Sequence, residues 1–314
     1  MTSMPSTRQI TEPQPEEQSA LYGNLQQRSG LLYEFWRAFR KNKLAVTSSI
    51  ILILIFLIAV MAPFLATHNP ELISLSRDAI KQAPSADHLL GTDHLGRDIW
   101  SRMLFGARIS LLVGFLTMAI SVTFGSVYGA ISGYYGGRLD TVMMRTVDIL
   151  LSLPTLFLLI ILAAFVKPNF LGIVVIIGLT SWMRVARLVR GQFLSLKEQE
   201  FVEASRALGY SNSRIIFVHI LPNVTAPIIV NATLMVAYAI LIESVLSFLG
   251  FGLQPPQFSW GSMLNAAQDI ILLRDAPWTA FFPGLAIFIT VLCFNFFGDG
   301  LRDALDPKLK NIKG

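Results

Sequence analysis

The sequence contains few charged residues and almost no cysteine. Only 14% of its 314 residues are Asp, Glu, Lys or Arg, whereas soluble domains carry about 25%. With 53% hydrophobic residues as well, the chain does not fit the soluble globular class and instead fits the class of membrane-embedded proteins. Its single cysteine, Cys293, lies in an apolar run. An internal disulfide is therefore excluded, and a packing role is expected for this thiol.

Two common binding motifs are also missing. The sequence has no glycine-rich loop of the form GxxxxGK[S/T], which excludes a phosphate-binding site of that kind in this chain. It has no basic stripe interleaved with exposed aromatic residues, so no nucleic-acid partner is expected. The formal net charge is nevertheless +5, which in a membrane chain is typical of Lys and Arg held in cytoplasmic loops.

Six hydrophobic runs approach the length of about 20 residues that a membrane span requires. They extend from Leu44 to about Ala66, from Ile109 to about Tyr134, from about Met144 to Val166, from Phe170 to about Met183, from about Val224 to Leu249 and from about Thr279 to Phe297. The fourth run is the weakest, because it is short before Arg184. The sequence therefore predicts an all-α membrane protein with six transmembrane helices.

An even number of spans places both termini on one side of the membrane. The two tails and the loops after the second and fourth spans hold 18 of the 25 Lys and Arg residues, so this side is predicted to be the cytoplasm. The expected organisation is a disordered cytoplasmic tail (1–30), an amphipathic segment with the first span (31–67), an extracytoplasmic loop (68–105), a transmembrane core (106–300) and a cytoplasmic C-terminal tail (301–314).

Three glycines recur every fourth residue in the second span. Gly125, Gly129 and Gly133 lie on one helical face, where the absence of side chains lets another helix approach closely. Glycine is also generally common in membrane helices, but the regular spacing favours a helix contact.

A polar segment between the fourth and fifth spans predicts a compact cytoplasmic knob near residues 201–213. Ser195 and Glu198 have the spacing of a capping box, and Gly209 fits the left-handed turn that ends a helix. Phe201, Ala204, Ser205 and Leu208 fall on one face at helical spacing, and Glu203 lies beside that face. A second short helix is expected from about Ser211, broken by Pro222 at the membrane surface.

The knob is predicted to be a docking surface for a soluble motor. Small residues at positions 204 and 205 would let it seat in a groove. The alternative is an amphipathic hairpin resting on lipid, but the apolar face is narrow for that purpose.

The knob sequence EASRALG (203–209), followed by HILP (219–222), resembles the coupling motif of ATP-binding-cassette (ABC) importer permeases. Three longer segments look like those of the C-type subunit of dipeptide, oligopeptide and nickel importers: 88–111, 243–264 and 294–310. Together with 35–46, they extend the resemblance over nearly the whole chain beyond residue 30. The sequence departs from the motif at Ser205, where alanine is usual, and at His219, where an apolar residue is usual.

The resemblance implies a type I ABC importer permease fold in a bacterial cytoplasmic (inner) membrane. The implied partners are a homologous B-type permease, two cytoplasmic ATPase subunits that bind ATP and Mg²⁺, an extracytoplasmic solute-binding protein and membrane lipid. No cofactor is expected on this chain, and it is not expected to be an enzyme. The residues that would couple to the ATPases are Glu203, Ala204, Ser205, Gly209, Leu221 and Pro222.

A second cytoplasmic contact is expected between the second and third spans. Asp140 and Arg145 are charged residues among apolar ones there, and Asp140 could cap the helix entering the third span. The resemblance implies a light contact with the motor, and a plain solvated turn is an equal alternative.

The external loop carries the sequence GTDHLGRD (91–98). Its glycines permit tight turns, and Asp93, Arg97 and Asp98 can form an ion-pair network that braces an extracytoplasmic entrance. The same loop holds His68, His88 and His94, but three histidines at irregular spacing are a poor ligand set. No metal site is therefore predicted.

Glu243 is an ionisable residue about two turns inside the outer end of the fifth span. Such residues generally face a cavity or a partner. Two roles are open: contact with a peptide amino terminus or gating of the pathway, and structural pairing with a neighbouring group.

Short peptides are the favoured cargo, because the resemblance is closest to peptide importers. Nickel complexes and opines remain open. A passive channel or secondary transporter is a remoter alternative, because it would more often show an internal repeat or paired charges within the membrane. A membrane-embedded enzyme would need several catalytic groups at one depth, where Glu243 stands alone.

Overall fold

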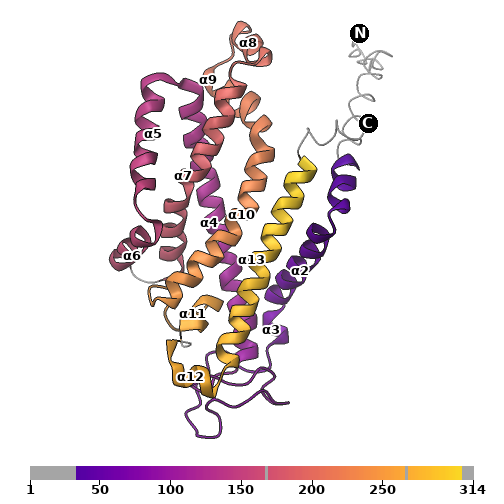
Figure 1. Cartoon of the computed structure of the whole chain (residues 1–314), viewed down its shortest axis with the longest axis vertical. Helices are drawn as coiled ribbons and strands as arrows, with labels where there is room; N and C mark the ends of the chain where they lie inside the picture. The colour runs from indigo at the N-terminus through magenta and orange to yellow at the C-terminus, as the bar shows by residue number, and fades with distance from the viewer. Residues whose placement is uncertain (1–32, 167–168, 266–267, 306–314) are drawn as a thin grey trace, which may run out of the picture.

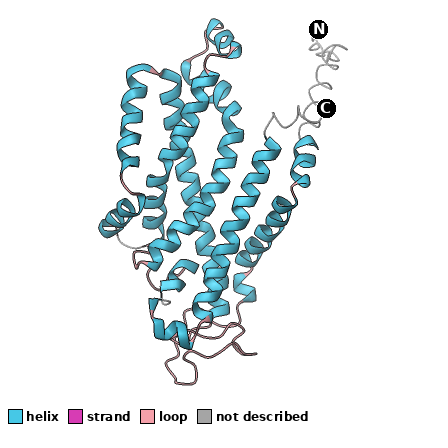
Figure 2. Cartoon of the chain, viewed as in Figure 1, coloured by secondary structure: helices cyan, strands magenta, loops and turns pink. Residues whose placement is uncertain are grey.

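The computed structural model describes residues 33–166, 169–265 and 268–305. In these ranges the chain is built from helices, with a single isolated bridge between Thr92 and Asp98 as the extended pairing (Figure 2). The tail expected at 1–30 and the last nine residues of the tail expected at 301–314 lie outside the described residues.

Among the described residues, five helical stretches are long and apolar enough to cross a membrane. They are α2 (Lys43–Val60), α4 (Ile99–Tyr135), α7 (Phe170–Leu196), the stretch Asn212–Phe248 that ends in α10 (Thr225–Phe248), and α13 (Trp278–Leu305). A sixth is obtained if α5 (Gly137–Ser152) and α6 (Thr155–Phe165) are counted as one broken span. These helices stand side by side in one bundle (Figure 1). The predicted all-α membrane fold is thus confirmed.

The third predicted span differs most from expectation. The chain bends by 89° between α5 and α6, at Leu153 and Pro154. The physical reason is that proline has no backbone N–H to continue the helix and restricts the residue before it. The prediction of one continuous helix from Met144 to Val166 was therefore wrong.

Two further helix boundaries were predicted too conservatively. The helix α7 continues to Leu196, well beyond Met183. Its arginines do not end it, because the apolar residues between them are buried against neighbouring helices. The helix α4 begins at Ile99, after Asp98 caps it by accepting a hydrogen bond from the Ser101 amide. The last residues of the expected loop 68–105 therefore belong to α4.

The contact between α4 and α7 forms the spine of the bundle. A Cβ atom added at Gly129 would lie 2.3 Å from the Ala186 carbonyl oxygen, and one at Gly125 would lie 2.6 Å from the Trp182 carbonyl oxygen. A Cβ at Gly133 would lie 2.6 Å from the Phe193 Cβ. The predicted glycine contact face is confirmed, and its partner is α7.

The helices α10, α13 and α2 pack in sequence on the other side of α4. The helix α2 is thinly covered, with Ile53 58% and Phe56 53% exposed. Such outward apolar faces fit lipid or another membrane protein. The two ends of the bundle differ: α8 (Glu200–Ala207) lies at one end, here called the knob end, and the loop 66–98 with α12 (Ile270–Asp275) lies at the other, here called the loop end (Figure 1).

Candidate functional site

The knob begins after a short break at the end of α7. The backbone turns at Lys197, and Gln199 in extended conformation precedes α8. Ser195 lies inside α7 rather than at a helix start, so the predicted capping box with Glu198 was wrong. The physical reason is that α7 stays helical past Ser195, which leaves no exposed amides there for the hydroxyl to cap.

The two faces of α8 have different characters. Val202 is fully buried and Ser205 is 6% exposed, with the Ser205 hydroxyl donating to the Phe201 carbonyl at 2.7 Å. Phe201, Ala204 and Leu208 point outward, and the Leu208 side chain is 71% exposed. Glu203 is also exposed. Ser205 therefore belongs to the inner face, whereas the sequence pattern placed it on one face with Ala204.

The turn after α8 behaves as the sequence predicts. Gly209 has a φ of +75°, a conformation that residues with side chains rarely adopt. Ser211 then caps the next helix by accepting from the Arg214 amide.

The prediction that Pro222 breaks this helix was wrong. The chain changes to wider π winding over Ile215–Ile220 and to 3₁₀ winding over Leu221–Val224, and it stays helical into α10. Leu221 packs against the core beneath α8, and Pro222 is exposed.

Aromatic contacts fix the knob to the bundle. The Tyr134 hydroxyl at the end of α4 donates to the Asn212 side chain at 2.8 Å, and the Arg206 guanidinium lies 5.6 Å from the Tyr134 ring centroid. The Tyr210 and His219 rings stack with centroids 5.3 Å apart and planes 4° apart. His219 thus has a structural contact, and a load on α8 would be transmitted to both α4 and α10.

A charged clamp joins α5 to the spine at the same end. Asp140 accepts two hydrogen bonds from Arg190, at 2.5 and 2.6 Å, and one from Ser132 at 2.5 Å. Asp140 does not cap α5, because it lies in the first turn and its carboxylate is held by α7 and α4 instead. Arg145 is exposed on α5. Arg190 was not predicted from the sequence, because its partner Asp140 lies on another helix. Arg187, three residues before Arg190, bonds Asp148 of α5 at 2.5 Å.

At the loop end, Asp93 is the centre of a compact network. Its carboxylate accepts from the backbone amides of Leu95 and Arg97, at 2.8 and 3.0 Å, and from the Arg97 side chain at 2.7 Å. Gly96 has a φ of +69°, and a Cβ there would lie 2.2 Å from the Ser74 carbonyl. The Asp93–Arg97 pair that the sequence predicts is present, while Asp98 instead caps α4 and lies 2.9 Å from the His88 ring nitrogen.

A cavity of about 600 Å³ opens beside this network. Its lining combines charged groups of the loop with the segment after α10, including Glu71, His94, Arg97, Arg102, Gln254 and Phe258. Arg102 is 6% exposed and lies 4.2 Å from the Phe258 ring centroid. Burial lowers the pKa of His94, the nearby Asp93 opposes this, and Arg97 and Arg102 add to the lowering. The lowered pKa favours the neutral imidazole of His94, and Arg97 and Arg102 supply positive charge to the cavity.

Glu243 lies behind the cavity and is completely buried. One of its carboxylate oxygens, Oε1, accepts hydrogen bonds from Ser247 and Ser259, both at 2.6 Å. Ser259 precedes α11 (Trp260–Asn265), whose first residue is also held by Ser110 of α4 through a 3.1 Å hydrogen bond. Glu243 therefore joins α10 to the segment that borders the cavity.

The architecture is that of a helical protein with several membrane-spanning helices, and the comparisons identify its family. Residues 125–311 match the family described as "Binding-protein-dependent transport system inner membrane component", and residues 30–87 match the "N-terminal TM domain of oligopeptide transport permease C". The chain belongs to this family of binding-protein-dependent inner-membrane transport components. Curated relatives of the chain are named as permease proteins of transport systems.

Several curated proteins are similar over most of the chain. The dipeptide transport system permease protein DppC of Bacillus subtilis (strain 168) is 46% identical over 275 residues, covering 88% of this chain and 85% of that protein. The glutathione transport system permease protein GsiD of Escherichia coli O6:K15:H31 is 42% identical over 278 residues, covering 88% and 91%. A solved structure of the MetNI methionine ABC transporter, inward facing, matches with a TM-score of 0.52 at 17% identity, covering 65% of this chain and 96% of that one. That likeness supports the fold.

Proposed function

We propose that this chain is the C-type permease subunit of an ATP-driven importer of short peptides. It would form a translocation path together with a homologous B-type permease in a bacterial inner membrane. Two ABC ATPase subunits would bind ATP and Mg²⁺ at the knob end, and an extracytoplasmic solute-binding protein would deliver cargo at the loop end. Both chain termini would then lie in the cytoplasm, because α2 starts and α13 finishes toward the knob end of the bundle (Figure 1).

The observation that carries the proposal is the outward apolar surface of α8. Phe201, Ala204 and Leu208 form a small exposed patch on a helix whose inner face is locked into the core. A patch of this kind on a rigid support fits a groove of another protein. Glu203 at its edge adds a charge that can orient the partner.

The mechanism follows from how α8 is connected. On one side the chain runs into α7, and on the other it continues as an unbroken helical stretch from Asn212 to Phe248. When ATP closes the ATPase dimer, paired knobs would be drawn together, and α7 and α10 would move as levers. The result would be a rocking of the bundle between inward-facing and outward-facing states, with no bond chemistry on this chain.

The Asp140–Arg190 clamp would hold α5 firm during this motion, and Arg145 would offer a second, lighter contact with the motor. At the loop end, the Asp93–Arg97 pair and the Asp98 cap of α4 would keep the entrance in shape.

Short peptides are proposed as cargo on two grounds. The curated relatives include permeases of dipeptide, oligopeptide and glutathione transport systems. The loop-end cavity also presents Arg97 and Arg102 beside Gln254 and Phe258, a mixture that suits a carboxylate attached to a polar backbone.

Substitutions in the knob test the coupling role. We expect Glu203→Lys and Gly209→Val to leave the chain inserted in the membrane and assembled, while ATP hydrolysis no longer drives uptake. The assay measures both ATPase activity and peptide uptake in proteoliposomes holding the whole transporter. Glu198→Lys is the matched control, because it makes the same charge change at an exposed position outside α8. Normal uptake in both knob variants would contradict the proposal.

A photo-crosslinker at position 208 identifies the partner directly. We expect it to capture an ATPase subunit in the assembled transporter, since Leu208 is 71% exposed. Capture of phospholipid alone would mean that α8 rests on the membrane.

A further inference from the structure

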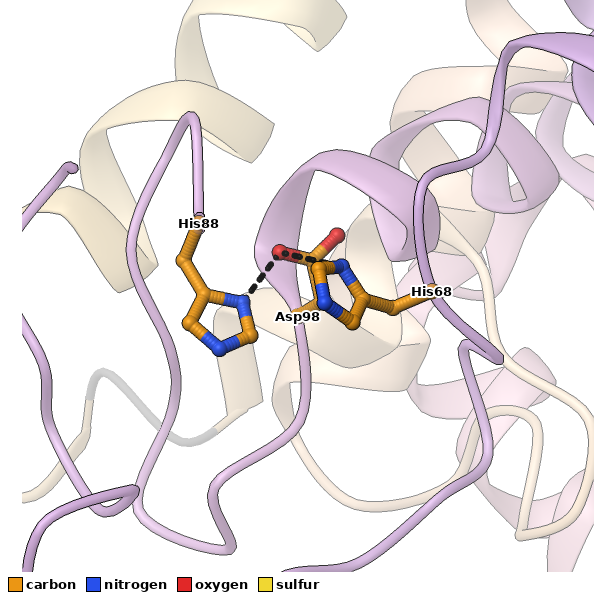
Figure 3. A group of neighbouring side chains, drawn as sticks. All are labelled: His68, His88 and Asp98. Atoms are coloured by element: carbon orange, nitrogen blue, oxygen red, sulfur yellow. Dashed lines mark hydrogen bonds and ion pairs between the residues drawn. The ribbon is translucent and has the colours of Figure 1, made fainter. Parts of the chain in front are cut away.

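Two histidines and an aspartate from separate segments converge at the loop end. His68 follows α3 (Ala62–Leu65), His88 lies in a turn of the loop, and Asp98 caps α4. The His88 Nδ1 lies 2.9 Å and the His68 Nδ1 3.9 Å from the same Asp98 oxygen. Figure 3 shows both imidazole rings turned toward this carboxylate. His94, the third histidine of the loop, lies apart from them and lines the cavity.

The carboxylate is held in place independently of the histidines. Asp98 Oδ2 accepts from the Ser101 amide at 2.8 Å, which leaves Oδ1 directed toward the two rings. The Ser101 hydroxyl in turn accepts from the His68 backbone amide at 3.1 Å. The His88 carbonyl accepts from the amides of Ser85 and Gly91, at 2.8 and 2.9 Å. All three segments are therefore positioned by backbone contacts before any ligand binds.

The donor set and its spacing suit a transition-metal ion. One ligand atom from each of the three side chains can be chosen so that all lie within 4.8 Å of one another. Bonds of about 2.0–2.1 Å to a tetrahedral zinc ion place ligand atoms roughly 3.3 Å apart. Small ring rotations would bring the three donors to that spacing. His68 Nδ1 would exchange its 3.0 Å hydrogen bond with the Thr67 hydroxyl for the ion.

We propose that His68, His88 and Asp98 bind a divalent transition-metal ion of the zinc class, with water completing its coordination. Two imidazoles and one carboxylate are typical of zinc and are poor ligands for Mg²⁺ or Ca²⁺. The Asp98 carboxylate is buried, with its side chain 1% exposed, and a bound cation would compensate its charge. This site goes beyond the transport function and does not depend on it.

The ion would join the loop 66–98 to the start of α4. His68 and Asp98 are separated by 30 positions in the sequence, and His88 lies between them. A shared metal ion would tie these three points together and restrict the loop that lies under the proposed solute-binding protein. Its contribution would be to hold the loop end in one shape.

Zinc binding to the purified transporter tests this inference. The complex is prepared without a polyhistidine tag, stripped with a chelator and titrated with ZnCl₂ by calorimetry, and bound zinc is counted by mass spectrometry. We expect one zinc per chain at the site. His68→Gln, His88→Gln and Asp98→Asn should each weaken its affinity at least about tenfold. Asn is itself a good N-cap, so Asp98→Asn removes the ligand charge while keeping the start of α4.

The matched control is His94→Gln, which removes a histidine of the same loop and should leave zinc binding unchanged. Zinc should also protect the loop 66–98 from proteolysis in the wild type but not in the variants. Equal zinc binding by the wild type and a His68→Gln/His88→Gln double variant would overturn the proposal. The cluster would then be only a hydrogen-bonded bracket around Asp98.

Discussion

The two ends of the bundle distribute apolar and charged groups in opposite ways. At the knob end, apolar side chains face outward, with Leu208 71% exposed. At the loop end, charged side chains face inward, and Asp93, Asp98 and Arg102 are 7%, 2% and 6% exposed. An outward apolar patch gains free energy by being covered, whereas an inward charge network gains it by staying intact. The knob end is thus suited to contact, and the loop end to keeping a shape.

The helix α4 connects these two ends. It starts at the cap Asp98 in the loop end and finishes at Tyr134 and Tyr135, where Tyr134 holds the knob. Its central glycines press against α7. The difference between the two ends can therefore be tested by substitutions, first in α4, which both ends share, and then at each end separately.

The largest effect is expected from Gly129→Leu in α4. The new side chain would meet the Ala186 carbonyl, since even a Cβ there would lie 2.3 Å from that oxygen. A backbone atom cannot move aside cheaply, so the helices must separate. We expect loss of folded protein, measured as the yield of monodisperse transporter and its thermal unfolding.

Gly191→Ala in α7 is the matched control, because a Cβ there meets nothing within 4 Å. It should leave yield and unfolding temperature essentially unchanged. A well-folded Gly129→Leu protein would show that α4 and α7 are not held together at this point.

The next largest effect is expected from Asp93→Ala at the loop end. This change leaves two backbone amides and the Arg97 side chain without their acceptor. Removing one partner of a buried charged network costs about 3–5 kcal/mol, and the damage should stay local. Limited proteolysis should cleave the loop 66–98 much faster, while a crosslink from the knob to its partner persists. Asp87→Ala, at an exposed position of the same loop, should have no such effect.

A smaller effect is expected from Arg190→Ala at the knob end. It removes the two hydrogen bonds to Asp140, but the Arg190 side chain is 32% exposed, so water replaces part of the loss. We expect a decrease in the free energy of unfolding of about 1–2 kcal/mol. The rate of backbone amide hydrogen exchange should rise in α5 and not in the loop 66–98. Arg145→Ala on the exposed face of α5 should leave both measures unchanged.

The sequence predicted the parts of this molecule that depend on local pattern. The apolar runs gave five of the six spans, and the spacing of Gly125, Gly129 and Gly133 gave the contact face of α4. The left-handed Gly209 followed from its position after a helix. These features are written in consecutive residues, so no knowledge of distant contacts was needed.

The features that could not be predicted from the sequence depend on residues far apart in the chain. The partner of Asp140 is Arg190 on another helix, and His68 meets His88 and Asp98 across the loop. The inward position of Ser205 depends on the core beneath α8. The accommodation of Pro222 depends on the π turn before it. A periodicity identifies a face, but only packing decides which neighbour covers it.

The smallest effect is expected from Glu243→Gln, which tests whether the loop end needs a charge in the membrane. A glutamine can place its amide oxygen where Oε1 accepts from Ser247 and Ser259, so both hydrogen bonds can persist. We expect a stability change below about 1 kcal/mol and peptide uptake within about twofold of the wild type. Glu243→Ala is the companion variant, and it should cost more because two buried hydroxyls lose their acceptor. If Glu243→Gln abolished uptake while unfolding stayed unchanged, the carboxylate would act in the pathway itself, and the loop end would take part in gating rather than only keep its shape.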